Sequence, residues 1–248
     1  MKRRGLVTVI AGLVIFGLGI ATGMFYVSIT AAADTFNGGK TYLLPVSSKQ
    51  LTMTIQPLRP SAKVLAVLPQ DESATRNIAQ QLTSEDGLNA LAEDISEFYR
   101  IPCEVGEELT IPDNCFNFDR QQYDTRLLLN WLVKEASPAS FRTAGVLDVD
   151  VYTEGYNFLF GQAKLGGNAC VTSAARMGMD LTIRKPEVRW HSIVRHEVGH
   201  TLGLDHVDDQ RSVMKFANSL AEHDIQGTQL TNYDWARLME LHPIDWKE

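Results

Sequence analysis

The fold of this chain is decided by the stretch His196-Glu197-Val198-Gly199-His200-Thr201-Leu202-Gly203-Leu204-Asp205-His206. Its first two histidines are four residues apart, so they lie one turn apart on one helix face and both rings reach one metal ion. Gly203 favours the positive φ that ends a helix, and the turn after it carries His206 back toward the other rings. Three protein ligands leave one position of a tetrahedral zinc ion open, which is typical of a catalytic zinc site.

The acidic residue in this stretch predicts hydrolytic chemistry. Glu197 follows the first predicted ligand directly, so its carboxylate lies close enough to the metal to take a proton from zinc-bound water. The chain has six histidines, and three of them fall in the pattern at the required spacings. Because the glycine and the third histidine are also present, the pattern is far more specific than HExxH alone. We therefore predict Glu197 as the general base, with His196, His200 and His206 as zinc ligands.

A methionine lies eight residues beyond the third histidine, at Met214. A single methionine is most often a filler of apolar gaps in the core. After an extended zinc motif, however, a methionine at this distance is typical of the Met-turn, the apolar floor beneath the three histidines of the metzincin zinc peptidases. The motif and Met214 together therefore resemble the metzincin clan.

Within that clan, the segments around the motif resemble the archaemetzincins. The similar segments are 123–132, 146–152, 156–163 and 169–176 before the motif and 214–224 from the methionine onward. The resemblance extends over about 51–241. It implies an α/β (α+β) metzincin-like fold, in which a twisted mixed sheet packs on a zinc-binding helix and a small C-terminal subdomain follows. It also implies a zinc metallopeptidase whose substrate is a peptide or protein.

One departure from the archaemetzincins concerns a second metal. Members of that family usually carry four cysteines that bind a structural zinc. Here the corresponding positions hold residues that cannot replace a thiolate as a soft ligand, namely Val207, Ser212, Asn232 and Trp235. We therefore predict one Zn²⁺ per chain. Apolar packing would then hold the C-terminal subdomain, with the candidates Leu230, Trp235, Leu238 and Leu241.

The resemblance also predicts how a substrate lies. In metzincins an extended peptide usually lies along the sheet edge above the zinc helix, and by resemblance that edge is 168–174. Main-chain hydrogen bonds would then provide affinity, and side-chain pockets would provide preference. Aminopeptidase and endopeptidase activity both remain open. The alternative function is a catalytically weak, zinc-containing protein that binds or assembles peptides, and the intact Glu197 favours the peptidase.

Composition excludes one class of partner. The chain has 248 residues, of which 44% are hydrophobic and 21% are charged, and its net charge is −7. This acidity, without a basic stripe, argues against a nucleic-acid partner. The sequence leaves the oligomeric state undecided.

The N-terminus predicts export. Three basic residues, Lys2, Arg3 and Arg4, precede an uncharged apolar stretch at 6–29 that is long enough to span a bilayer. Small residues before Asp34 fit a cleavage site after Ala33. The expected organisation is a membrane anchor or signal peptide at 1–33, a linker at 34–50 and the peptidase domain at 51–248. The domain would lie outside the cytoplasm, either on a single-pass cell-membrane anchor or secreted or periplasmic after cleavage.

The three cysteines are Cys103, Cys115 and Cys170. An exported domain is able to oxidise its thiols, so a disulfide between Cys103 and Cys115 is one expectation. Cys170 lies in an apolar run and is expected to be a small buried side chain.

Periodicity predicts alternating strands and helices. An apolar run at 64–68 either extends the first strand or begins an insertion. The predicted strands are 51–58, 101–105, 145–152, 157–162 and 169–174. One predicted helix begins at Ser84, and three others cover 124–135, 188–202 and 232–241.

Overall fold

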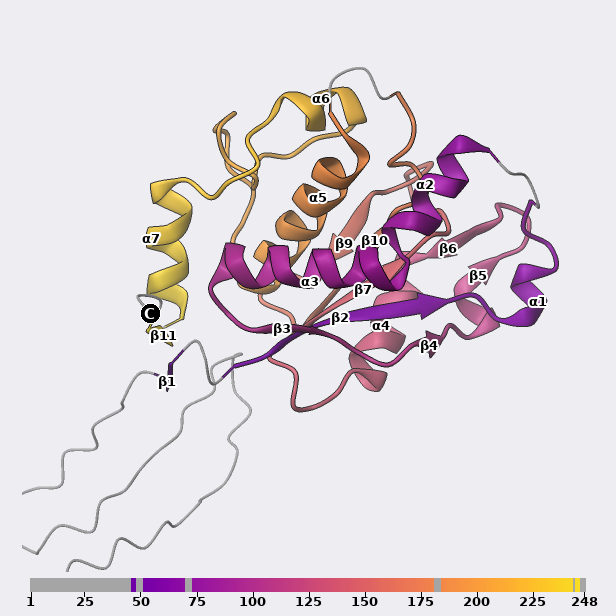
Figure 1. The fold of residues 1–248 in the computed structure, drawn as a ribbon, viewed down its shortest axis with the longest axis horizontal. Coiled ribbons are helices and arrows are strands. Elements are labelled where there is room, and N and C mark those ends of the chain that lie inside the picture. The colour runs from indigo at the N-terminus through magenta and orange to yellow at the C-terminus, as the bar shows by residue number, and fades with distance from the viewer. Residues whose placement is uncertain (1–45, 48–50, 70–72, 181–183, 243, 246–248) are drawn as a thin grey trace, which may run out of the picture.

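The structure is a computed structural model of the chain (Figure 1). It describes residues 46–47, 51–69, 73–180, 184–242 and 244–245. The predicted segment 1–33 and nearly all of the linker 34–50 lie outside the described residues. None of the helices in the described part of the chain is long and apolar enough to cross a membrane.

The core of the domain is one mixed sheet with the strand order β3-β2-β7-β10-β9, in which β4 also pairs with β2. Every pairing is parallel except that of β9 with β10. The strands are β2 (Met53–Arg59), β3 (Cys103–Val105), β4 (Leu109–Thr110), β7 (Arg142–Leu147), β9 (Gly161–Ala163) and β10 (Ala169–Ser173). Because parallel strands are covered on both faces, β7 and β10 are buried throughout and β2 almost throughout. The predicted strand 51–58 corresponds to β2, which spans 53–59 and is buried on both faces.

The free edge of this sheet differs from the predicted one. Strand β10 lies between β7 and β9, so the prediction that 168–174 forms the edge is wrong. The edge is β9, which runs antiparallel to β10 and is joined to it by a bend at Gly166, where φ is +66°. The predicted strand 157–162 overlaps β9 only at its last two residues, because a three-residue strand before a glycine turn carries too short a pattern to give its bounds.

Helices cover both faces of the sheet (Figure 1). Helices α2, α3 and α5 contribute to the apolar cluster on one face, whereas α1 and α4 contribute to the cluster on the other. Adjacent strand residues alternate between the clusters, since Val146 joins the first and Leu147 the second. The helices are α1 (Ala62–Leu65), α2 (Ala74–Leu82), α3 (Glu85–Tyr99), α4 (Thr125–Glu135), α5 (Pro186–Thr201), α6 (Leu220–Ile225) and α7 (Asn232–Leu241).

Side-chain caps explain where these helices begin. Ser84 accepts a hydrogen bond from the Gly87 amide at 3.3 Å, and Asp124 accepts one from the Arg126 amide at 2.9 Å. These caps confirm the predicted starts of α3 and α4. Ser61 likewise caps α1, so the run at 64–68 does not extend the first strand: its first two residues end α1 and the other three form a turn. Helices α2 and α6 were not predicted.

Two small sheets accompany the main one. Strands β5 (Phe116–Asn117), β6 (Gln122–Asp124) and β8 (Val151–Tyr152) form one, while β1 (Val46–Ser47) and β11 (Ile244–Asp245) form a parallel pair. The predicted strand 145–152 is therefore divided. Its first part ends β7, and its last two residues join a different sheet.

The thiols are free in this structure. Cys103 packs against the cluster that contains α3 and α5, whereas Cys115 is buried in the cluster on the opposite face. The expected Cys103–Cys115 disulfide is therefore absent, because the sheet separates the two side chains. Cys170 is fully buried, as expected, and burial raises the pKa of its thiol well above the usual range.

The C-terminal helix α7 joins the main core. Leu230 and Leu238 are buried in the cluster that contains α5, and Trp235 packs against it. This confirms the predicted apolar packing. A polar contact that was not predicted accompanies it, because the buried Asp234 carboxylate accepts hydrogen bonds from Ser212 Oγ at 2.7 Å and from the Thr231 amide at 2.8 Å.

A buried ion pair fixes α5 to α6. The Arg189 side chain on α5 is 0% exposed, and its guanidinium donates to both oxygens of Asp224 on α6. Its remaining N–H groups donate to the carbonyls of Met177, Met179 and Asp180. A fully satisfied buried arginine of this kind stabilises one arrangement of the elements, provided that all its partners are present.

We predict that Asp224→Asn destabilises the protein by about 3 kcal/mol, because it leaves the Arg189 charge buried without a counter-ion. Chemical denaturation of the zinc-loaded protein measures this change. The control is Arg237→Gln, which breaks an exposed pair with Glu240 and should leave the stability unchanged. Equal effects of the two variants would contradict the assigned role of the buried pair.

Candidate metal centre

Three histidine rings converge at the C-terminal half of α5 and the turn after it. The Nε2 atoms of His196 and His200 are 3.0 Å apart, and those of His200 and His206 are 3.1 Å apart. The Nε2 atoms of His196 and His206 are 3.2 Å apart. The structure therefore brings together all three predicted ligands. No other group of three or more histidine, cysteine or acidic side chains converges in this way within the described ranges.

Backbone carbonyls fix which nitrogen of each helical histidine faces the centre. His196 Nδ1 lies 2.7 Å from the Val213 carbonyl oxygen, and His200 Nδ1 lies 2.8 Å from that of Leu204. A carbonyl only accepts hydrogen bonds, so each Nδ1 carries the proton and each Nε2 presents a lone pair to the centre. Such contacts orient a ligand ring and increase its basicity.

The end of α5 places one of these carbonyls. The Gly203 amide donates to the His200 carbonyl and the Leu204 amide donates to that of Gly199, both at 3.0 Å. With Gly203 at a φ of +87°, this is a Schellman motif. The turn brings the Leu204 carbonyl under His200 and directs the chain toward His206. Gly203 thus has the role that the sequence predicted.

The Met-turn forms the floor of the centre. A Cβ atom at Gly199 would lie only 2.5 Å from the sulfur of Met214, so the thioether packs directly on the helix between the two ligands. Ser212 Oγ accepts a hydrogen bond from the Met214 amide at 2.9 Å, and the Val213 carbonyl meets His196. The prediction for Met214 agrees with this placement.

Glu197 lies between the zinc helix and the edge strand. The side chain is buried, and its carboxylate has no hydrogen-bond partner among the described residues. Burial raises the pKa of this carboxyl to about 8, since no neighbouring group stabilises the charged form. A cation held by the histidines would lower that pKa again. The site therefore contains a carboxyl group that is able both to take up and to release a proton.

The edge strand approaches Glu197 very closely. A Cβ atom at Gly161 would lie 2.7 Å from Glu197 Cγ and 2.9 Å from Thr172 Cγ2. Only glycine fits at this position, so the spacing between β9 and the zinc helix depends on the missing side chain. No local pattern in the sequence marks this role of Gly161, because it appears only once the strand and the helix are placed together.

The rings are electrically neutral, as metal binding requires. Burial is the largest cause that lowers the pKa of His196, to about 3, and the neighbouring His200 adds to the shift. Burial also lowers the pKa of His200 and of His206. The converging lone pairs of His196 and His200 repel one another unless a cation lies between them.

The spacing fits zinc. Ligand nitrogens at about 2.0–2.1 Å from a tetrahedral zinc ion are about 3.3 Å from one another. The observed separations of 3.0–3.2 Å are close to this value. Neutral imidazoles are ligands that zinc accepts readily, so the residues present fit this metal.

The remaining histidines lie outside the centre. His191 Nδ1 lies 3.2 Å from Asp94 Oδ1, and this ring is not among the three that converge. His223 is 4% exposed in α6, and the ring of His242 contacts the Leu202 carbonyl at 2.7 Å.

Groups that are distant in sequence hold the zinc helix in place, and none of them was predicted as part of the site. The Tyr99 hydroxyl donates to the Arg195 carbonyl at 2.5 Å, and the Arg195 guanidinium pairs with Asp94 of α3. The buried Arg142 of β7 donates to the Thr201 carbonyl at 3.0 Å. No local pattern marks these residues, since each acts on a segment far away in sequence.

Comparison with known proteins gives a consistent result. The model of "Peptidase family M54" matches residues 100–239. The archaemetzincin of Methanocaldococcus jannaschii is 33% identical over 129 residues, which cover 50% of this chain and 70% of that protein. The archaemetzincin of Methanopyrus kandleri is 38% identical over 117 residues, 46% of this chain and 64% of that protein. Its crystal structure aligns with a TM-score of 0.59 and 26% identity over 80% of this chain and 98% of that one.

We predict that Gly199→Ala weakens zinc binding and destabilises the protein by about 1–3 kcal/mol, because the new methyl group displaces the Met214 sulfur. Denaturation of the zinc-loaded protein and a zinc titration measure both effects. In the double variant with Met214→Ala the methyl group has space, so the loss in free energy of unfolding should be smaller than the sum of the losses in the two single variants. Additive losses would show that the two residues do not interact.

Proposed function

Because the chain belongs to peptidase family M54, the archaemetzincins, it is a zinc metallopeptidase, and we propose that it hydrolyses peptide bonds with Glu197 as the general base. The observation that carries this proposal is the position of the Glu197 carboxylate. It is buried, without a hydrogen-bond partner in the part of the chain that the structure describes, on the helix that carries His196 and His200, and it lies against the edge strand. A structural carboxylate would have a hydrogen-bond partner there.

The proposed chemistry assigns a separate role to each side chain. His196, His200 and His206 hold the zinc ion, which when bound acidifies water and polarises a carbonyl group. Glu197 orients the attacking water and accepts its proton. The same carboxyl then delivers that proton to the leaving amine. Its burial keeps the proton in the site between the two transfers.

The substrate that fits this site is an extended peptide along β9. This strand is the last one of the sheet on this side, and its neighbour Glu197 lies directly beneath Gly161. Main-chain pairing with an exposed strand edge provides affinity with little dependence on sequence. The proposed contact is therefore with β9 and not with 168–174, because β10 lies inside the sheet and β9 is the last strand on this side.

We propose one zinc ion per chain. The observation that supports this number is that the described residues contain a single converging ligand set. Val207 and Trp235, two positions that the resemblance matches to cysteine ligands, pack against the apolar core, and a third, Ser212, bonds to Asp234. The C-terminal subdomain thus has a set of contacts that needs no metal.

We further propose that the peptidase domain acts outside the cytoplasm. The support is in the sequence alone, where a basic start precedes an apolar stretch at 6–29. In this proposal the segment either anchors the domain to the cell membrane or is removed after Ala33.

We predict that Glu197→Ala abolishes hydrolysis while the zinc ion stays bound. Loss of the general base lowers kcat/KM by a factor of about 10²–10⁴. Wild type and variant are incubated, zinc-loaded, with a mixed-peptide library, and the products are identified by mass spectrometry. The positions of the cuts separate aminopeptidase from endopeptidase activity.

Metal analysis of the same two preparations is the control. One zinc per chain in both confirms that the variant has lost the base and not the metal, and two would contradict the proposed number. If both proteins contain zinc and their products are identical, Glu197 is not the base. If neither cuts any peptide, the alternative of a zinc-containing peptide-binding protein is favoured.

We predict that a reporter enzyme that works only outside the cytoplasm is active when fused after Glu248. A fusion that lacks residues 1–33 is the control and should be inactive. Equal activity of the two fusions would contradict export by the N-terminal segment.

A further inference from the structure

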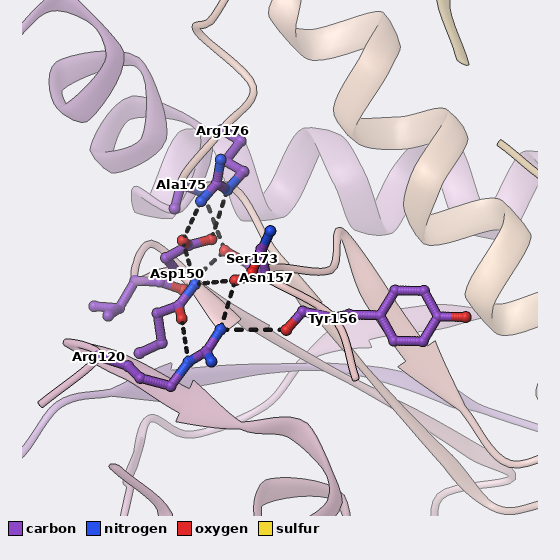
Figure 2. Close-up of polar contacts among 9 residues, drawn as sticks. Arg120, Asp150, Tyr156, Asn157, Ser173, Ala175 and Arg176 are labelled. Carbon is purple, nitrogen blue, oxygen red and sulfur yellow. Dashed lines mark hydrogen bonds and ion pairs between the residues drawn. The ribbon is translucent and has the colours of Figure 1, made fainter. Parts of the chain in front are cut away.

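A second polar cluster lies away from the histidines, at the carboxyl ends of β7 and β10 (Figure 2). It consists of Arg120, Gln122, Asp150 and Arg176, and we call it the Asp150 cluster. The Asp150 carboxylate accepts hydrogen bonds from Arg176 Nε at 2.9 Å, Arg176 Nη2 at 2.6 Å and Gln122 Nε2 at 2.7 Å. Arg120 Nε in turn donates to Gln122 Oε1 at 2.9 Å.

This cluster holds the loop 153–160, which connects β8 to the edge strand. Arg120 Nη2 donates to the carbonyls of Tyr156 at 3.2 Å and Asn157 at 3.0 Å, and Gln122 Nε2 also donates to the Asn157 carbonyl, at 2.9 Å. Within the loop the Tyr156 amide closes a turn onto the Thr153 carbonyl at 3.1 Å. The Tyr156 side chain points away from the cluster (Figure 2).

The far end of the loop is held by the same group of side chains. The Arg176 guanidinium lies 3.8 Å from the centre of the Phe158 ring, and the Phe158 and Phe160 rings are 5.4 Å apart. The Ser173 amide donates to the Phe160 carbonyl at 2.8 Å. Phe160, the residue before β9, therefore contacts the cluster through Phe158 and the end of β10 through Ser173.

The charge of Arg120 is compensated by the loop and not by an acid. Its described partners are Gln122 Oε1, the two loop carbonyls and the Tyr152 ring, whose centre is 4.2 Å from the guanidinium. Hydrogen bonds from a charged donor are stronger than those between neutral groups. An exposed arginine that meets two consecutive carbonyls in this way fixes the orientation of both peptide groups.

The position of the loop matters because β9 has little freedom. Gly161 follows Phe160 directly and lies against Glu197, where a single added methyl group would clash. A small displacement of the loop therefore moves the strand either into Glu197 or away from it. Such a displacement would change the register or the distance at which a peptide pairs with β9.

We propose that Arg120 and Asp150 are positioning residues of the peptidase, which hold the loop 153–160 so that β9 is preformed for an extended substrate. This inference rests on the proposed function, since it concerns the strand along which the substrate would lie. Neither residue touches the reacting atoms. Their contribution is to the binding of the peptide and not to the transfer of protons at Glu197.

The test uses Arg120→Gln and Asp150→Asn in the zinc-loaded full chain, with one peptide that the wild type cleaves from the mixed library. We expect KM to rise about tenfold in each variant, because strand pairing weakens, with kcat within about twofold of the wild type. Asp148→Asn is the matched control. Asp148 lies two residues before Asp150, outside the cluster, and its variant should have the KM of the wild type.

Amide hydrogen exchange supplies a readout that does not depend on turnover. Exchange at residues 156–163 should become faster in both variants and stay unchanged in the control, while the zinc content of all proteins remains equal. Arg120 is exposed, so its variant should fold even if Asp150→Asn does not.

Three results would overturn the inference. The first is an unchanged KM in Arg120→Gln, and the second is unchanged amide hydrogen exchange at 156–163. The third is a variant that loses its zinc and has a lower kcat. If the wild type cleaves no peptide, the proposed function fails. Exchange then decides by itself whether the Asp150 cluster holds the strand.

Discussion

The Nε2 lone pairs of His196 and His200 meet at 3.0 Å and repel one another, and the rest of the structure is arranged to hold these two rings and His206 there. Helix α5 supplies two of them at a spacing that only a regular helix gives. Its own end supplies the carbonyl that orients His200, and the Met-turn supplies the one that orients His196. A cation between the rings converts this repulsion into binding, so metal affinity and fold are linked.

Helix α5 is held by contacts on several sides, and together these contacts fix its position relative to the sheet. Tyr99 and Asp94 of α3 bind Arg195. Arg142 of β7 binds the Thr201 carbonyl, and α6 contributes Asp224 to the buried Arg189. Each contact joins charged or strongly polar groups within a low-dielectric interior, where an unsatisfied partner is costly. The helix consequently has one position relative to the sheet, and Glu197 has one position relative to β9.

The side of the site that faces β9 depends on the absence of a side chain. Gly161 lets the edge strand approach Glu197, and the Asp150 cluster fixes the loop that leads into this strand. On the opposite side of the zinc helix, Ser212 and Asp234 join the Met-turn to α7 by hydrogen bonds. The chain therefore uses arginine–carbonyl and hydroxyl–carboxylate contacts to hold the two segments that border the metal centre.

The sequence by itself determined the convergence of His196, His200 and His206, the helix end at Gly203 and the placement of Glu197 and Met214 beside them, because all of these depend on spacing within 19 consecutive residues, 196–214. Helices α3, α4 and α7 were also predicted, since each has a local cap or an apolar period. The edge at β9, the separation of Cys103 from Cys115, the burial of His223 and the roles of Gly161 and Asp150 were decided by tertiary structure. In each of these cases the deciding contact joins residues that are distant in sequence, and no local pattern records such a contact.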